Sequence, residues 1–207
     1  MDREEIEQRV ARRVAALAAG EKVLAPPVDS DFSLAGVTPP AEFRPAAVLV
    51  PLVMRPDGPT VLLTQRTEDM PSHAGQIAFP GGRRQPEDAD LIATALREAR
   101  EEIGLDPKFV HVIGALDPYV TGTGFMVTPI VGLVELGFIV TPDPREVAEV
   151  FEVPLAHFLD ATNHQIHSRT WQGRERRYYA MPYGDRYIWG ATAGMLKNLY
   201  AVLVGDA

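Results

Sequence analysis

The chain has 207 residues, a formal net charge of −8 and no cysteine. Its length fits one domain with an extension, and 46% hydrophobic and 23% charged residues are ordinary proportions for a globular protein. Without cysteine, disulfides, thiolate metal sites and cysteine nucleophiles are excluded. The acidic balance argues against a nucleic-acid partner, and an anionic small substrate would need a metal cation or a local arginine cluster to offset the repulsion.

No uninterrupted apolar run approaches the roughly 20 residues of a membrane-spanning helix, so no membrane partner is expected. Residues 1–20 begin with acids and lack the apolar core of a signal peptide. We therefore expect a cytoplasmic protein.

Residues 1–40 are expected to form a helix followed by an irregular arm. Apolar residues recur at spacings of three and four between Ile6 and Leu17, which predicts a helix over residues 2–19. Residues 24–45 are rich in proline and short polar side chains, which indicates an irregular connection. The helix is expected to pack either on its own domain or on a second copy of the chain, as a homodimer.

Residues 41–207 are expected to form one main domain in which strands and helices interleave. Apolar runs at 46–54, broken by Pro51, and at 60–66 flank a turn and predict a hairpin. Strands are predicted at 110–120 and 125–136, and a helix over the first part of 144–160, which breaks at Pro154 before a short second helix. A hairpin of aromatic strands is predicted over 167–190, turning at Gly173. An amphipathic helix is predicted at 191–204. The fold class is therefore mixed α/β.

Residues 88–105 have a strong helical periodicity, with an apolar stripe made up of Leu91, Ile92, Ala95, Leu96, Ala99 and Ile103. Glu98, Glu101 and Glu102 lie off this stripe, within roughly a third of the helix circumference. Like charges at this spacing repel, and the helix dipole disfavours anions near the C-terminal end. A divalent cation such as Mg²⁺ or Mn²⁺ would remove this penalty, because carboxylate oxygens are the ligands it prefers. The alternative is a solvated acidic face compensated by the two neighbouring arginines.

The stretch upstream, FPGGRRQPED at residues 79–88, places a glycine pair and a proline ahead of the helix. A tight loop there would return its backbone towards the acidic face, so that loop and helix converge on one metal-filled cleft. Together they resemble the signature of the Nudix hydrolases, in which a glycine and a spaced acid precede Arg-Glu-aliphatic-any-Glu-Glu-any-Gly-aliphatic. The matching positions are Gly82, Asp88, Arg97, Glu98, Ala99, Glu101, Glu102, Gly104 and Leu105. Asp88 stands where the family has Glu, and one extra residue separates it from Arg97.

The resemblance implies an α/β/α sandwich built on a mixed sheet, and the hydrolysis of a diphosphate that joins a nucleoside to another moiety. It implies Glu98 and Glu102 as principal ligands of Mg²⁺ or Mn²⁺, with the backbone carbonyl of Gly82 completing the shell. Glu101 would bind a second metal or the attacking water. Glu101, Glu102 or the loop acid Glu146 would take the proton from that water. For Glu146 the alternative is a solvated acid in the first turn of a helix.

Residues 62–82, LLTQRTEDMPSHAGQIAFPGG, resemble the extra signature of the coenzyme A pyrophosphatase branch of that family. The matching positions are Leu62, Leu63, Thr64, Arg66, Gly75, Phe79, Pro80, Gly81 and Gly82. Thr67 and Pro71 stand where the branch has a small residue and an arginine. Similarity before and after this stretch extends the resemblance over about residues 40–200. It implies hydrolysis of coenzyme A or its derivatives to 3′,5′-ADP and 4′-phosphopantetheine.

Arg66, His73, Gly75 and Gln76 are the candidate substrate-binding residues of this stretch, although His73 and Gln76 could serve only the structure of the loop. Two other functions stay open. One is a Nudix diphosphatase that acts on ADP-ribose, a dinucleotide or a nucleoside triphosphate. The other is a non-catalytic Nudix binding module, which the presence of all three helix glutamates disfavours.

Overall fold

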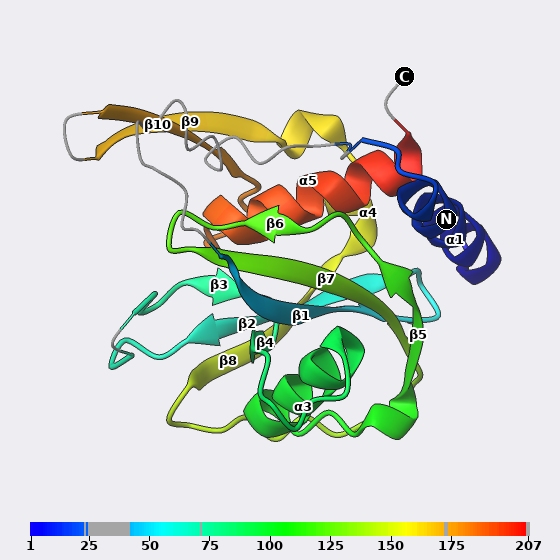
Figure 1. The fold of residues 1–207 in the computed structure, drawn as a ribbon. Coiled ribbons are helices and arrows are strands. Elements are labelled where there is room, and N and C mark those ends of the chain that lie inside the picture. The colour runs from blue at the N-terminus through cyan, green and yellow to red at the C-terminus, as the bar shows by residue number, and fades with distance from the viewer. Residues whose placement is uncertain (23, 25–41, 71, 172–173, 206–207) are drawn as a thin grey trace.

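The computed structural model describes residues 1–22, 24, 42–70, 72–171 and 174–205. Its elements are α1 Arg3–Ala18, β1 Arg44–Val53, β2 Thr60–Arg66, β3 Ile77–Ala78, β4 Gly81–Arg83, α3 Leu91–Ile103, η1 Pro107–Phe109, β5 Val110–Ala115, β6 Tyr119–Val120, β7 Phe125–Val134, β8 Val147–Pro154, α4 Leu155–Phe158, η2 Ala161–Asn163, β9 Gln165–Trp171, β10 Arg174–Ala180 and α5 Gly190–Val204. A mixed sheet forms the middle layer, with α3 on one face and α1 and α5 on the other (Figure 1). The β9–β10 hairpin lies beyond α5.

Strand β1 occupies the centre of the sheet, whose main order is β3-β2-β1-β7-β5. It pairs in parallel with β7 along its whole length, and antiparallel with β4 near its start and β2 near its end. β8 pairs with β2, and β5 and β6 pair with β7. The predicted break at Pro51 is wrong, because Pro51 lies opposite Gly132 within the continuous β1–β7 ladder. Proline removes one N–H donor there, and the neighbouring pairs keep the strand extended.

Alternation along β1 sends its side chains into two hydrophobic cores. Leu49 belongs to the core on the α3 side, together with Ala47, Ala95, Ala99 and Ile103. Val50 belongs to the opposite core, together with Leu52, Ile6, Val10, Leu196 and Leu199. Helices thus cover both faces of a mixed sheet, which confirms the predicted α/β sandwich.

The helix predicted over the first part of residues 144–160 is wrong, since Val147–Pro154 form strand β8. Val147 and Val153 are buried and the strand pairs antiparallel with β2. A run rich in valine fits a pleated, half-buried surface, and the free edge of β2 supplies the partner that a helix would lack. The short helix expected after Pro154 is confirmed as α4.

Helix α5 is buried around most of its circumference, so the predicted amphipathic pattern is wrong there. It lies between the sheet and the β9–β10 hairpin, which together cover it (Figure 1). In α3 the predicted stripe is confirmed except at Ile92, which is exposed. None of the helices in the described part of the chain has both the length and the apolarity needed to cross a membrane.

The predicted N-terminal helix is confirmed as α1, which begins after Asp2, whose side chain accepts a hydrogen bond of 2.9 Å from Glu5 N. The irregular arm predicted next falls mostly on residues 25–41, outside the described residues, so the domain boundary near residue 40 stays a prediction. The aromatic hairpin is confirmed as β9 and β10. Its predicted turn at Gly173 also lies outside the described residues.

A buried ion pair ties α1 to the rest of the molecule. Arg13 of α1 and Asp117, between β5 and β6, are 5% and 3% exposed, and Arg13 Nη2 lies 2.8 Å from Asp117 Oδ1. Asn198 of α5 donates to Asp117 Oδ2 at 2.9 Å and accepts from Asp117 N at 3.1 Å. Because the carboxylate is fully hydrogen-bonded, it joins three distant segments in one place.

We predict that Asp117→Asn lowers the free energy of unfolding by about 3–5 kcal/mol, because it leaves the buried Arg13 guanidinium with only the exposed carboxylate of Glu21, at 3.8 Å, as a counter-charge. Glu135→Gln is the matched control, since it breaks an exposed pair with Arg3 and should cost at most about 1 kcal/mol. Urea denaturation monitored by circular dichroism measures both. Equal, small losses would contradict a structural role for the buried pair.

Candidate active site

Helix α3 has defined signals at both ends. Asp90 caps its start, accepting a hydrogen bond of 2.8 Å from Ala93 N, so the helix begins at Leu91. Gly104 ends it in the left-handed conformation with φ 69°, which glycine adopts without steric cost. The predicted stop at Gly104 is confirmed.

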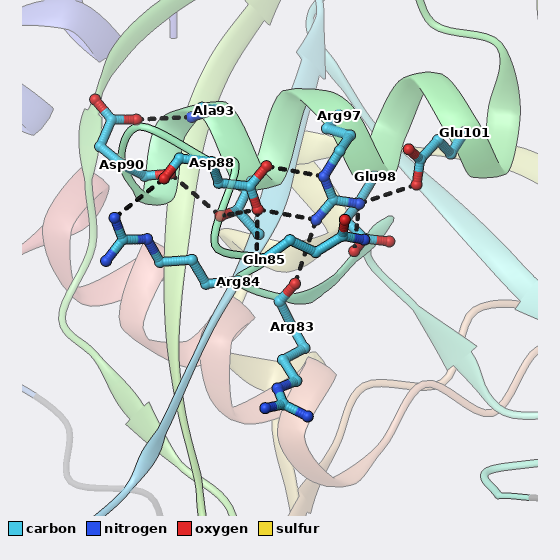
Figure 2. A network of polar contacts seen from close by, with 10 residues as sticks. Arg83, Arg84, Gln85, Asp88, Asp90, Ala93, Arg97, Glu98 and Glu101 are labelled. Carbon is cyan, nitrogen blue, oxygen red and sulfur yellow. Dashed lines mark hydrogen bonds and ion pairs between the residues drawn. The ribbon is translucent and has the colours of Figure 1, made fainter.

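Arg97 joins the helix to the loop before it (Figure 2). Its Nε and Nη2 donate to the two carboxylate oxygens of Asp88 at 2.9 and 3.0 Å. Its Nη1 lies 2.9 Å from both Glu98 Oε1 and Glu101 Oε2, and its Nη2 donates to Arg83 O at 3.2 Å. One planar guanidinium therefore holds the loop and two of the glutamates together.

Asp88 reaches Arg97 in spite of its shorter side chain and the extra residue between them. Gln85 N and Thr94 Oγ1 also donate to Asp88 Oδ2, at 2.8 and 2.9 Å. The guanidinium of Arg97, followed by the Gln85 amide, holds the pKa of Asp88 well below its usual range. The carboxylate is thus charged at all physiological pH values and acts as the anchor of the loop.

Glu102 is buried, at 6% exposure, and accepts a hydrogen bond of 3.2 Å from Gly81 N. Burial raises its pKa to about 8, with further contributions from the charges of Glu98 and Glu146. Burial also raises the pKa of Glu98. The two helix carboxylates therefore face the glycine loop in a place that disfavours their negative charge.

The glycine pair lies in β4, neither glycine has a positive φ, and both make close contacts. A Cβ on Gly81 would lie 2.5 Å from Ala47 O and from Val48 Cα of β1. A Cβ on Gly82 would lie 2.6 Å from Glu98 Oε1. The backbone of β4 is thus wedged between the central strand and the acidic face of α3.

The donor set on α3 and β4 fits a hard divalent cation. Glu102 is buried and Glu98 is half-buried, burial raises the pKa of both, and the charge of Glu98 raises that of Glu102 further, so a cation between them would offset both penalties. The Glu101 side chain is 57% exposed and is paired with Arg97. Within the described residues, no group of three or more acids or histidines has the arrangement of a metal site. Glu101 would have to leave Arg97 to join one.

A cavity of about 710 Å³ lies between the 72–79 loop, β6, β7 and the start of α5, and its lining includes Gly81, whose N donates to Glu102. Its polar part includes Arg66, His73, Gln76 and Gly81. Arg66 Nε is buried and makes no hydrogen bond within the protein, and the charge of Arg66 lowers the pKa of Glu102. Arg66 and Gly81 therefore belong to the lining of the cavity and also act on Glu102.

The loop after β2 shapes this polar part. His73 has a positive φ of 59°, and its Nδ1 lies 2.9 Å from Gln76 Oε1. Gly75 has φ 67°, and a Cβ there would collide with the carboxylate of Glu68. Three of the predicted substrate-binding residues thus line the cavity, while Gly75 supports the turn behind them. Pro71, one of the two departures from the branch signature, lies outside the described residues.

Glu146 was predicted as a loop acid, and the alternative, an acid in the first turn of a helix, is wrong. It lies in the turn before β8, where its carbonyl accepts a hydrogen bond of 3.0 Å from Thr67 N. Its charge raises the pKa of both Glu98 and Glu102. Its carboxylate therefore lies close to the acidic face of α3.

Sequence patterns missed the apolar part of the cavity, which includes Tyr119, Phe125, Val127, Trp189 and Met195. The TGTG stretch at 121–124 lies between the strands predicted at 110–120 and 125–136, and three of its residues line the cavity. The side chain of Thr192 near the start of α5 donates to Ile77 O at 3.0 Å, holding α5 against β3. No local pattern marks these positions, because they come together from separate elements.

Residues 43–172 match the NUDIX domain family. The chain is 44% identical over 156 residues to an uncharacterized Nudix hydrolase NudL of Photorhabdus laumondii, covering 75% of this chain and 83% of that one. NudL of Yersinia pestis gives the same identity over 78% of its length. A solved Nudix hydrolase from Alicyclobacillus acidocaldarius has a TM-score of 0.50 at 20% identity, over 77% of this chain and 92% of that one. The solved structure of DR0079 from Deinococcus radiodurans has a TM-score of 0.51 at 14% identity, over 79% of this chain and 88% of that one.

The solved structures support the fold, and the domain match and the relatives support the family. The chain belongs to the Nudix hydrolases, enzymes that cleave pyrophosphate bonds and generally use divalent cations such as Mg²⁺.

The raised pKa of Glu102 predicts a pH-dependent stability of the metal-free protein. Between pH 4.5 and about 8 the carboxyl is protonated when folded and ionised when unfolded. The contribution of this carboxyl to stability is therefore most favourable below pH 4.5 and falls as the pH rises through this window, with the full penalty above about pH 8. Glu102→Gln should remove this fall and stabilise the protein at pH 8.5 by on the order of 2–4 kcal/mol. Urea denaturation of the wild type and of Glu102→Gln at pH 5 and 8.5, with a chelator present to remove metal, measures this difference. If the free energies of unfolding of the two proteins changed in parallel with pH, the burial of this charge would be contradicted.

The glycine pair gives a second prediction. Gly82→Ala should displace only the flexible end of Glu98, leaving the fold within about 1 kcal/mol of wild type but reducing the rise in melting temperature on adding Mn²⁺. Gly81→Ala should instead cost about 1–3 kcal/mol or more, because its Cβ meets backbone atoms of β1. Thermal melts with and without Mn²⁺ separate the two effects. An undiminished Mn²⁺ response in Gly82→Ala would show that the cation binds elsewhere.

Proposed function

We propose that the chain hydrolyses the diphosphate bond of coenzyme A or its derivatives to 3′,5′-ADP and 4′-phosphopantetheine. The observation that carries this is the cavity beside Glu102, which has an apolar, aromatic part and a polar part at Arg66 and Gly81. A diphosphate with large organic groups on each side needs such a combination. The match of residues 62–82 to the coenzyme A branch supports this substrate over others.

In this proposal Glu98, Glu102 and the carbonyl of Gly82 hold Mg²⁺ or Mn²⁺, and Glu101 joins a second metal or the attacking water after leaving Arg97. Such a cation supplies neutralisation of the phosphate charge and a more acidic water. The residues that carry these roles already lie on the two facing segments, α3 and β4. Arg97 joins α3 to the loop at Asp88 and to β4 at Arg83 O.

Arg66 is proposed to bind a phosphate oxygen, since its buried Nε makes no hydrogen bond within the protein. His73 and Gln76, hydrogen-bonded to each other, line the same part of the cavity and would contact the substrate next to it. Water adds to one phosphorus, and the bridging oxygen leaves with the other phosphate. Among Glu101, Glu102 and Glu146, we favour Glu146 as the base, because it lies beside the helix carboxylates without being a proposed ligand.

The experiment is product analysis after incubation of the purified chain with coenzyme A, ADP-ribose and NADH in Mg²⁺ and in Mn²⁺. We expect 3′,5′-ADP and 4′-phosphopantetheine from coenzyme A at the highest kcat/KM. Faster turnover of ADP-ribose or NADH would show that coenzyme A is not the preferred substrate, while the assignment as a diphosphate hydrolase would stand. No turnover of any diphosphate, including nucleoside triphosphates, would favour a binding module.

Glu98→Gln should lower kcat for the preferred diphosphate by about 100-fold or more, since changes even to outer-shell partners of a metal ligand cost roughly 10–100-fold. Its free energy of unfolding should be unchanged or slightly higher, because one of two repelling carboxylates is gone. Glu87 is an exposed acid of the loop between β4 and α3. Glu87→Gln is the control and should retain full activity. Unchanged kcat for Glu98→Gln in excess metal would remove Glu98 from the site.

A further inference from the structure

Four aromatic rings lead outward from the cavity onto the β9–β10 hairpin. Trp189 lines the cavity, and its ring centroid lies 5.2 Å from Tyr178 and 6.3 Å from Tyr187. Tyr178 is stacked on His167 of β9 at 5.9 Å, with an interplanar angle of 26°. The wall of the cavity at Trp189 is therefore continuous with an aromatic face of the hairpin.

The same hairpin is basic in an acidic protein. Residues 165–180 contain four arginines and one acid, whereas the chain as a whole has a net charge of −8. In the ladder His167 pairs with Tyr178, and two residues further on Arg169 pairs with Arg176. Because side chains alternate along a strand, Arg169 lies on the same face as His167. The next residue on this face of β9 after His167 is thus the arginine Arg169.

We infer that Trp189 and the adjoining face of β9–β10 bind the 3′-phosphoadenosine half of the substrate. The adenine base packs on Trp189, and the 3′-phosphate lies towards Arg169. Purine bases stack on aromatic side chains, and arginine is well suited to phosphate groups. This inference rests on the proposed function and says which part of the site binds the 3′-phosphoadenosine half of the substrate.

The pantetheine half fits this face less well. It has no aromatic ring to stack on Trp189, and in the intact substrate it carries no phosphomonoester that an arginine could bind. The 3′-phosphate is the most highly charged group of coenzyme A outside the diphosphate. A protein of net charge −8 would repel it unless a basic segment stood next to its site.

Fluorescence of Trp189 tests the placement directly. The chain has two tryptophans, so Trp171→Phe leaves Trp189 as the single emitter. In that background 3′,5′-ADP and 5′-AMP should each quench the emission, and 4′-phosphopantetheine should not. Quenching by 4′-phosphopantetheine alone would place the other half of the substrate on Trp189 and overturn the inference.

Arg169→Ala tests the phosphate contact. It should weaken binding of 3′,5′-ADP about tenfold and leave 5′-AMP unchanged, and raise KM for coenzyme A but not for dephospho-coenzyme A, with kcat retained. Arg177 is an exposed arginine on the opposite face of β10. Arg177→Ala is therefore the control, and it should change neither the binding of 3′,5′-ADP nor the KM for coenzyme A. If Arg169→Ala weakened 3′,5′-ADP and 5′-AMP equally, and raised KM equally for coenzyme A and dephospho-coenzyme A, the contact with the 3′-phosphate would be contradicted.

The two proposals fail separately. If coenzyme A is hydrolysed but Trp189 does not respond to 3′,5′-ADP, the inference is wrong and the proposed function stands. If coenzyme A is not hydrolysed while 3′,5′-ADP binds with the expected dependence on Arg169, the subsite is supported and the proposed reaction is wrong.

Discussion

The carboxylate of Glu102, buried against the backbone amide of Gly81, is the contact on which the site depends. A buried negative charge with a second carboxylate beside it is unfavourable, and its pKa of about 8 expresses this. The glycine loop can approach α3 so closely only because no Cβ stands between β1 and the acidic helix. A site that destabilises its own empty form in this way gains most from a cation.

The rest of the structure keeps that unfavourable contact in place. Arg97 holds the loop to α3 by a two-pronged pair with Asp88, and Thr94 and the Gln85 amide complete the hydrogen bonding of the carboxylate (Figure 2). Beneath it, β1 is anchored on both sides, by β7 in parallel and by β2 and β4 antiparallel. The central strand thus acts as the rigid support on which loop and helix are assembled.

The opposite layer positions the cavity. Helix α5 is held against β3 through Thr192 and against Asp117 through Asn198, so its first residues stand over the cavity next to the β6–β7 turn. Trp189 immediately before the helix touches both the cavity and the hairpin. The end of the chain therefore completes a site whose chemical groups lie about 90 residues earlier in sequence.

The sequence by itself determined the features that depend on local order. Gly104 stops α3 because glycine takes the left-handed conformation, and the spacing of Glu98, Glu101 and Glu102 puts them on one face of a helix. The signature over residues 82–105 indicated the family and the acidic face of α3, and the 62–82 stretch pointed to Arg66, His73 and Gln76, which line the cavity. Only the tertiary structure decided that Val147–Pro154 is a strand, because the free edge of β2 selects it over a helix. It also decided the apolar wall of the cavity, where Tyr119, Phe125 and Trp189 meet from separate elements, since contacts between distant segments leave no periodic trace along the chain.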